Sequence, residues 1–192
     1  MRSFIRTQLW PAVAVLLALT LITGFIYPVA VTAVAQVAFP SQANGSQIVA
    51  DGRTVGSTLI GQAFEDPEYF WGRPSAAGDG YDPTVSGGSN LAPTSQALID
   101  AITARVDALR AANGGAPIPV ELATASASGL DPHISPAAAE YQVPRVAKAR
   151  GMTEDSVRAV VARHTSQPLF GFLGEATVNL LEVNLDLDGL LR

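Results

Sequence analysis

The segment SASGLDPHISP, residues 126–136, contains the residue types of a serine hydrolase: two serines, an aspartate and a histidine. In such enzymes a histidine takes the proton from the serine hydroxyl group, and a carboxylate orients the histidine. These three side chains must converge on one point, which close neighbours in a sequence seldom do. The sequence also lacks the G-x-S-x-G pattern that presents a nucleophile on a sharp turn. Catalysis by this segment is therefore one of two interpretations.

The other interpretation is a structural turn. Pro132 favours an extended backbone for the residue before it, and side chains two apart on an extended chain share a face, so Asp131 and His133 can touch. Serine and aspartate side chains in turns often hydrogen-bond nearby backbone groups. We predict that three side chains do so here and cap a helix that begins near Pro136: Ser126, Ser128 and Asp131.

Few groups are suited to bind a metal ion. The chain has no cysteine and two histidines, His133 and His164, which do not form an H-x-x-x-H pair. It also lacks a D-x-D-x-D-G calcium loop. Asp186 and Asp188 would share one face of a strand, but such a pair is more often part of a solvated surface. We expect no metal site.

Residues 85–90, VSGGSN, have the composition of a phosphate-binding loop, because backbone N–H groups of glycine-rich turns can bind anions. The segment lacks the Lys-Ser/Thr ending of a Walker A sequence. We favour a structural turn ahead of a helix over a nucleotide site. The candidate nucleotide contacts are Ser86, Gly87, Gly88, Ser89 and Asn90.

The first quarter of the chain predicts a membrane anchor. Charged residues make up 15% of the sequence, against about a quarter in typical soluble proteins, and none lies between Arg6 and Asp51. About 20 apolar residues cross the hydrocarbon core of a bilayer as a helix, and Trp10–Val29 meets that length. We predict a transmembrane helix and its extension over residues 10–38, with Pro28 near its outer end, where a kink is tolerated.

Two alternatives to an anchor are weaker. Ala33–Ala35 fits the small-x-small site of signal peptide cleavage, but the apolar region of a signal peptide is only about 7–15 residues long. A buried helix of a soluble protein is seldom apolar on every side over such a length.

The basic residues predict the orientation of this helix. Arg2 and Arg6 precede it, and the next basic residue is Arg53. Because basic residues stay in the cytoplasm, we place residues 1–9 inside and residues 39–192 in the periplasm. All 17 acidic residues and 10 of the 12 basic ones lie beyond the helix, a formal balance of −7. Such an acidic domain is poorly suited to nucleic acid.

The exported part predicts a single α+β domain with a small sheet. Asp51-Gly52 is a strong turn pair for a hairpin within Gln47–Phe64. Residues 65–93 are rich in Gly, Pro, Ser and Asp, and we expect an ordered loop pinned by its aromatic residues.

Three helices and a strand complete the predicted domain. Helical periodicity, capping residues and stop signals place the helices at residues 94–113, 136–150 and 153–164. The final segment, VNLLEVNLDLDGLL, alternates apolar and polar residues over positions 178–191. This alternation predicts a half-buried strand.

Five sequence blocks, in this order, resemble one family along the whole chain. They are GSTLIGQAF, YFWGRPSA, SGGSNLAPTS, TASASGLDPHISPAAAEYQVPRVAKARG and VNLLEVNLDLD, after a short basic N-terminus and one apolar helix. The chain resembles the C subunit of the bacterial Kdp-type potassium-transporting P-type ATPases. Ala92 stands where the family usually has glycine, a mild departure.

The resemblance implies an accessory subunit of an ATP-driven potassium uptake pump in the bacterial inner membrane. Its implied partners are a potassium-translocating subunit, an ATP-hydrolysing P-type subunit and a small membrane subunit, and it would be needed for assembly, stability and activity of the complex. The chain lacks the phosphorylation motif D-K-T-G-T. We therefore expect no catalytic residue and no bound cofactor here, with ATP and potassium handled by the complex.

The resemblance also bears on individual residues. Family members have been proposed to bind nucleotide through the stretch at residues 86–90, which resembles the LSGGQ motif of ABC transporters. The predicted topology places that stretch outside the cytoplasm, and we favour the topology. The matching blocks offer these candidates for structural or partner contacts: Arg73, Pro74, Ser75, Ser126, Ser128, Gly129, Asp131, Pro132, His133, Arg145, Asn179 and Asn184.

Two other function classes remain as alternatives. A membrane-anchored periplasmic hydrolase would need Ser126, Ser128 or His133 for an activity of the isolated domain. A free-standing binding module would bind a soluble ligand without membrane partners.

Overall fold

The computed structural model describes residues 2–191. The chain divides after Ser46 into two compact units, a helical N-terminal unit and a C-terminal domain. The domain combines helices with a two-stranded and a three-stranded antiparallel sheet, so the predicted α+β class is confirmed.

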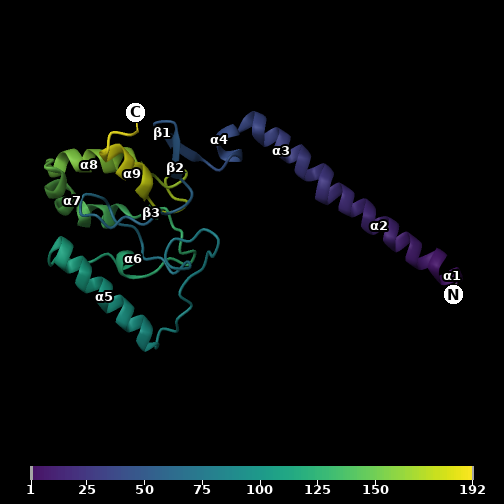
Figure 1. Cartoon of the computed structure of the whole chain (residues 1–192), viewed down its shortest axis with the longest axis horizontal. Coiled ribbons are helices and arrows are strands. Elements are labelled where there is room, and N and C mark those ends of the chain that lie inside the picture. The colour runs from purple at the N-terminus through teal and green to yellow at the C-terminus, as the bar shows by residue number, and fades with distance from the viewer. Residues whose placement is uncertain (1, 192) are drawn as a thin grey trace. The chain divides into compact units, whose positions relative to one another are not determined.

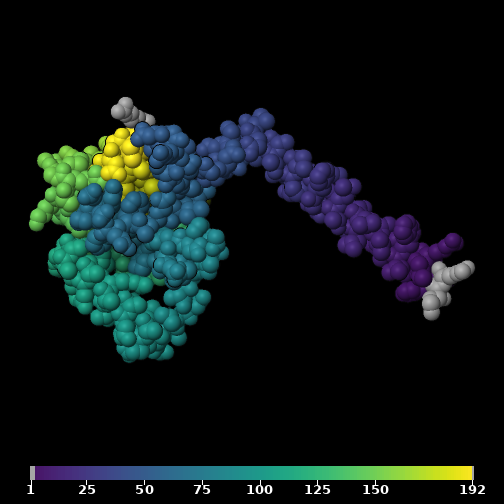
Figure 2. All heavy atoms as spheres, in the orientation of Figure 1, coloured from purple at the N-terminus to yellow at the C-terminus, as the bar shows by residue number. Residues whose placement is uncertain are grey.

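The N-terminal unit is one long helix followed by a short one (Figure 1). Ile5–Ala38 is long and apolar enough to cross a membrane. Its 34 residues extend about 51 Å, well beyond a hydrocarbon core of about 30 Å, which agrees with a helix that continues past the bilayer. None of its segments has a buried residue, and Figure 2 shows its side chains uncovered on the visible face. The segments are α1 (Arg2–Phe4), η1 (Ile5–Leu9), α2 (Trp10–Leu21), η2 (Ile22–Ile26) and α3 (Tyr27–Ala38), and α4 (Pro40–Ala43) follows.

Widened π-helical turns accommodate the two prolines of this helix. The Trp10 N–H donates to the Ile5 carbonyl oxygen and the Tyr27 N–H to that of Ile22, each directly before a proline. A proline ring clashes with the carbonyl group four residues earlier in a regular helix. The i→i−5 turns therefore let the helix pass both Pro11 and Pro28 without ending.

The domain begins with the predicted hairpin. β1 (Gln47–Ala50) pairs antiparallel with β2 (Arg53–Ser57). Asp51 and Gly52 both have positive φ, 50° and 75°, as a two-residue hairpin turn of the mirror-image type requires. The prediction for this turn is confirmed.

Residues 58–95 contain no helix or strand, which includes the loop predicted over residues 65–93, and α5 (Gln96–Asn113) follows. Ser95 occupies the N-cap position of α5, and Gly114 ends the helix with φ 83°. A short helix, α6 (Val120–Ala123), was not predicted, because four residues are too few to establish a helical period.

α7 (Pro136–Arg150) and α8 (Glu154–Arg163) confirm the next two predicted helices. The Ser135 hydroxyl oxygen accepts the Ala138 N–H and caps α7, while Thr153 caps α8 by accepting the Ser156 N–H. The prediction that Ser126, Ser128 and Asp131 cap the helix at Pro136 was wrong. Ser135 is the residue directly before the helix, where a side-chain oxygen reaches the first free N–H groups.

The predicted C-terminal strand was also wrong. Only β5 (Thr177–Asn179) is extended, and α9 (Leu180–Leu187) occupies the rest. The Asn179 side chain accepts the Glu182 N–H and caps α9. Apolar residues at 181, 183, 185 and 187 satisfy a strand period, but the pairs four apart equally fit a helix. Asn184 is buried together with Leu180 and Leu181, which lie four and three residues before it. This spacing is that of one face of a helix.

Long-range pairing builds the second sheet, in the order β3-β5-β4, from β3 (His133–Ile134), β5 and β4 (Thr165–Ser166). α7, α8 and α9 lie together beside it, with α5 and α6 toward the other end of the domain (Figure 1). The core forms among these elements and the loop at residue 70, and its largest fully buried side chains include Phe70, Ile134, Val143, Val146, Val157, Val178, Leu180 and Val183.

Candidate functional site

The serines of SASGLDPHISP shape a turn. Ser126 is 3% exposed, and its Oγ accepts the Gly129 N–H at 2.8 Å. Ser128 Oγ accepts the Leu130 N–H at 3.1 Å. Within residues 2–191, neither hydroxyl group hydrogen-bonds to His133. These contacts confirm the predicted bonds from the serines to backbone groups and differ from the serine–histidine bond of a hydrolase.

Asp131 orients the turn toward an arginine. Its Oδ1 accepts the His133 N–H at 3.0 Å, and its Oδ2 accepts Arg73 Nη1 at 3.1 Å. His133 Nδ1 lies 4.0 Å from Asp131 Oδ1, and the histidine side chain is 38% exposed. The two side chains do share a face, as predicted, but the stronger carboxylate contact is with Arg73. Pro132 joins this turn to the start of α9, because its carbonyl oxygen accepts the Leu180 N–H.

The segment Arg73–Ser75 lies beside the turn formed by residues 126–131 and holds it through hydrogen bonds. The Pro74 carbonyl oxygen accepts the Ser126 N–H at 3.2 Å. Ser75 Oγ donates to the Gly129 carbonyl oxygen at 2.6 Å and accepts the Tyr81 N–H at 2.8 Å. The Ser75 side chain therefore links its own loop to a turn 54 positions farther along the sequence.

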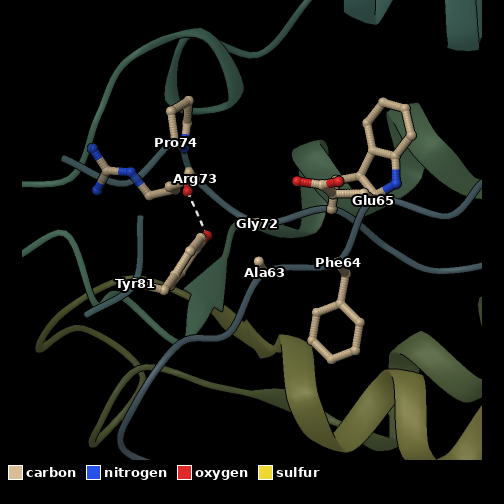
Figure 3. Close-up of a pocket in the computed structure, with 8 residues that line it drawn as sticks. Ala63, Phe64, Glu65, Gly72, Arg73, Pro74 and Tyr81 are labelled. Atoms are coloured by element: carbon tan, nitrogen blue, oxygen red, sulfur yellow. Dashed lines mark hydrogen bonds between the residues drawn. The ribbon is translucent and has the colours of Figure 1, made fainter. Parts of the chain in front are cut away.

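Tyr81 completes this group of residues. We call the group the 73–131 cluster and define it as Arg73–Ser75, Tyr81 and residues 126–131. The Tyr81 hydroxyl group donates to the Arg73 carbonyl oxygen at 2.6 Å (Figure 3). Burial raises the pKa of Tyr81 to about 12. The side chain is therefore a neutral donor at physiological pH.

The glycine-rich segment packs against the same cluster. The Gly87 N–H donates to the Ser128 carbonyl oxygen at 2.8 Å, and Ser86 Oγ donates to the same oxygen at 3.0 Å. A Cβ atom added at Gly88 would lie 3.2 Å from the Ala127 carbonyl oxygen. Gly88 therefore allows close backbone approach, whereas a Cβ atom at Gly87 would meet nothing within 4 Å. The Gly87 amide is already used within the protein. Asn90, at the end of the segment, has φ 52°.

A cavity of about 250 Å³ opens beside the cluster (Figure 3). Three aromatic residues, Phe64, Trp71 and Tyr81, are among those that line it. Arg73 Nε is buried and has no hydrogen-bond partner among residues 2–191. The lining residues are Ala63, Phe64, Glu65, Trp71, Gly72, Arg73, Pro74 and Tyr81.

A second group of polar side chains fixes the loop at residues 67–71. Asn184 Oδ1 accepts the Phe70 N–H at 2.8 Å, and its Nδ2 donates to the Phe70 carbonyl oxygen at 3.0 Å. Gln142 forms the equivalent pair of bonds with the Trp71 backbone, at 2.8 and 3.1 Å. Two buried amides thus take the place of neighbouring strands for a segment with no sheet partner.

Arg145 connects these amides to the loop. Its Nη1 donates to the carbonyl oxygens of Pro67 and Tyr69 at 2.6 and 2.9 Å, and its Nη2 donates to Gln142 Oε1 at 2.7 Å. The guanidinium carbon lies 4.0 Å from the centre of the Trp71 ring. Burial lowers the pKa of Arg145 to about 10, so the group stays charged at neutral pH.

Some members of this second group were predicted from the sequence. Asn184 and Arg145 were candidates, and the loop was expected to be pinned by aromatic residues, but Gln142 and Arg150 were missed. Gln142 lies three residues before Arg145, on the same face of a predicted helix, which was a usable signal. Arg150 donates to the Glu68 and Leu187 carbonyl oxygens and to Asp188.

The remaining candidates serve separate contacts. Asn179 Nδ2 donates to the Thr58 carbonyl oxygen at 2.8 Å and so holds the end of the hairpin segment near β5. Asp186 and Asp188 do not share a strand face. Asp186 Oδ2 lies 2.8 Å from His164 Nε2 and from Arg163 Nη2. Burial raises the pKa of Asp186, but the contacts with His164 and Arg163 outweigh burial and lower it overall.

Known proteins resemble this chain over nearly its whole length. The family described as the K+-transporting ATPase, c chain, matches residues 9–189. A Potassium-transporting ATPase KdpC subunit of Sorangium cellulosum is 62% identical over 185 residues, covering 95% of this chain and 97% of that protein. The protein of the same name in Polaromonas naphthalenivorans is 58% identical over 188 residues, covering 96% of each. With the apolar helix and the α+β domain already described, these matches show that the chain belongs to the KdpC family of potassium-transporting ATPase subunits.

Proposed function

We propose that this chain is a non-catalytic accessory subunit of an ATP-driven potassium uptake pump, needed for the assembly, stability and activity of the complex. The family match over residues 9–189 carries this proposal. Its partners would be the potassium-translocating subunit, the ATP-hydrolysing P-type subunit and the small membrane subunit. Handling of ATP and potassium would belong to those partners.

The use of the polar side chains supports an architectural role. The hydroxyl groups of Ser75, Ser126 and Ser128 bond backbone groups, and so do Gln142 and Asn184. Ser126, Gln142 and Asn184 are also buried, and a buried side chain that satisfies the backbone is not free to act on a substrate. What these contacts produce is a rigid surface, and a rigid surface suits contact with another subunit.

Such a subunit can affect transport without taking part in the chemistry. Contacts that differ in strength between two pump states shift the populations of those states by the difference in contact free energy. The formal charge of −7 beyond the helix would also attract potassium ions, although physiological salt screens this attraction beyond about 8 Å.

The first prediction concerns the orientation, with the N-terminus in the cytoplasm and the domain in the periplasm. Ser3 and Ser166 are both exposed, and the chain has no cysteine of its own. Ser3→Cys and Ser166→Cys can therefore be labelled one at a time with a membrane-impermeant maleimide applied to intact cells with a permeabilised outer membrane. We expect labelling of Ser166→Cys only. Labelling of Ser3→Cys alone would reverse the orientation.

The second prediction concerns the membrane helix. Ala14 and Ala18, and likewise Thr20 and Gly24, are small residues four apart, a spacing that lets helices approach closely in lipid. A Cβ atom at Gly24 would contact only Thr20 Cγ2, at 3.9 Å, so the helix itself tolerates a larger residue. We expect Gly24→Leu to weaken co-purification with the other subunits. Leu17→Ala, in the same helix, is the control, and equal recovery of both variants would indicate a lipid-facing site.

Co-purification tests the proposed function itself. The tagged chain, extracted from membranes in mild detergent, should recover a potassium-translocating subunit and a P-type ATPase subunit in fixed proportion. A soluble ligand recovered in place of membrane subunits would favour a free-standing binding module. Recovery of the chain alone from cells that express the whole operon would contradict the proposal.

A further inference from the structure

The loop between β4 and β5 carries an exposed cluster of large apolar side chains. Its centre, residues 168–174, reads PLFGFLG, and we call it the apolar loop. Phe170 and Phe172 are 78% and 73% exposed, and Leu169 and Leu173 are 63% and 51% exposed. Single exposed apolar residues are ordinary, but four on one short loop mark a contact surface.

The apolar loop is closed by its own backbone. Leu169 and Leu173 exchange two hydrogen bonds, at 3.0 and 2.9 Å. The Gly171 N–H donates to the Pro168 carbonyl oxygen at 2.9 Å, and the Phe172 N–H donates to that of Leu169 at 3.3 Å. The Phe170 and Phe172 ring centres are 6.5 Å apart. The side chains are therefore presented on a turn in which four backbone N–H groups donate to carbonyl oxygens of the same turn.

The loop is also free of formal charge. No Asp, Glu, Lys or Arg lies between Arg163 and Glu175. Entry into a bilayer is costly for charged groups and for backbone groups that lack partners. The apolar loop avoids the first cost because it has no charge, and it reduces the second because four of its N–H groups donate within the turn.

We propose that the apolar loop inserts into the interfacial region of the bilayer that the N-terminal helix crosses. Residues 39–46 alone connect that helix to β1, and a connection of this length spans at most about 28 Å. A helix that spans the membrane already anchors the chain, so insertion of the loop adds orientation and not attachment. It would fix how the domain is turned toward the membrane.

Lipid suits this surface better than a protein partner does. Protein interfaces surround an apolar centre with a polar rim and form about one hydrogen bond per 100–200 Å² of contact. The apolar loop offers apolar side chains and few free donors. The proposal depends on the membrane span and not on the pump assignment, so the two can fail separately.

Spin-label accessibility tests the insertion. Because the chain has no cysteine, Phe170→Cys and Phe172→Cys each carry a single nitroxide while the rest of the apolar loop is unchanged. The full chain is reconstituted in phosphatidylcholine vesicles, without other subunits. Collisions with oxygen, which concentrates in lipid, are compared with collisions with a water-soluble nickel chelate.

The expected result is a ratio of oxygen to nickel collisions above unity at both loop positions. Val120→Cys is the matched control, since Val120 is 74% exposed at the start of α6, and its ratio should be below unity. A ratio below unity at 170 and 172 would place the loop in water and overturn the proposal. Exclusion of both agents would indicate a contact with a second copy of the chain and would overturn it equally.

Discussion

Gly129→Ala is expected to lower the free energy of unfolding of the C-terminal domain by about 2–5 kcal/mol, a large part of the 5–15 kcal/mol typical of a domain. Gly129 has φ 68°, and an added Cβ would lie 2.7 Å from Ala77 Cβ and 2.7 Å from the Gly87 carbonyl oxygen. The substitution therefore combines left-handed backbone strain with a clash inside the 73–131 cluster. Urea unfolding of the full chain in detergent measures the effect, followed by Trp71 fluorescence in a Trp10→Phe background.

Gly151→Ala separates the two causes. Gly151 has φ 63°, nearly that of Gly129, but an added Cβ there meets nothing within 4 Å. We expect only the backbone strain, about 1–2 kcal/mol. Equal losses at the two glycines would show that the close packing around Gly129 contributes nothing to stability.

The second large effect is expected at Arg145. Arg145→Met keeps most of the side-chain stem but removes the donors to the Pro67 and Tyr69 carbonyl oxygens and to Gln142. Each buried acceptor left without a donor costs about 1–3 kcal/mol, so we expect a total loss of about 3–5 kcal/mol. The same unfolding measurement applies, and the environment of Trp71 should change as well, because the guanidinium group lies over its ring.

Two controls define the Arg145 result. Arg158→Met removes an exposed arginine that contacts Glu140, Glu154 and Asp155, and exposed ion pairs contribute little to stability. Arg145→Lys keeps the charge but loses the planar fork, so it should fall between the two. A loss at Arg145→Met no larger than at Arg158→Met would contradict the assigned role.

The sequence predicted those elements whose signals are local. The apolar helix, the Asp51-Gly52 hairpin, α7 and α8 each carry their own period, turn or cap, and all four were found. β3 and β4 have only two residues each and exist because they pair with β5. α9 was mistaken for a strand because its apolar residues satisfy both periods.

The candidate site was predictable in its parts but not in its connections. The hydrogen-bonding roles of Ser126 and Ser128 within their turn follow from local chemistry. The contact between Arg73 and Asp131 joins residues 58 positions apart, and no spacing rule reveals such a pair. The two hydrogen bonds between the Asn184 side chain and the Phe70 backbone join residues 114 positions apart. They too could be found only in the folded chain.

The central claim is that the 73–131 cluster is architecture and not a catalytic site. Potassium-dependent ATP hydrolysis by the assembled complex, carrying Ser126→Ala and His133→Ala together and normalised to the amount of complex, tests it most directly. Loss of the Ser126 hydroxyl leaves the Gly129 N–H without its acceptor, which should lower domain stability by about 1–3 kcal/mol without touching any chemical step. We predict that most of the activity remains, and loss of activity from a complex that still folds and assembles would contradict the account and make Asp131 the next residue to test.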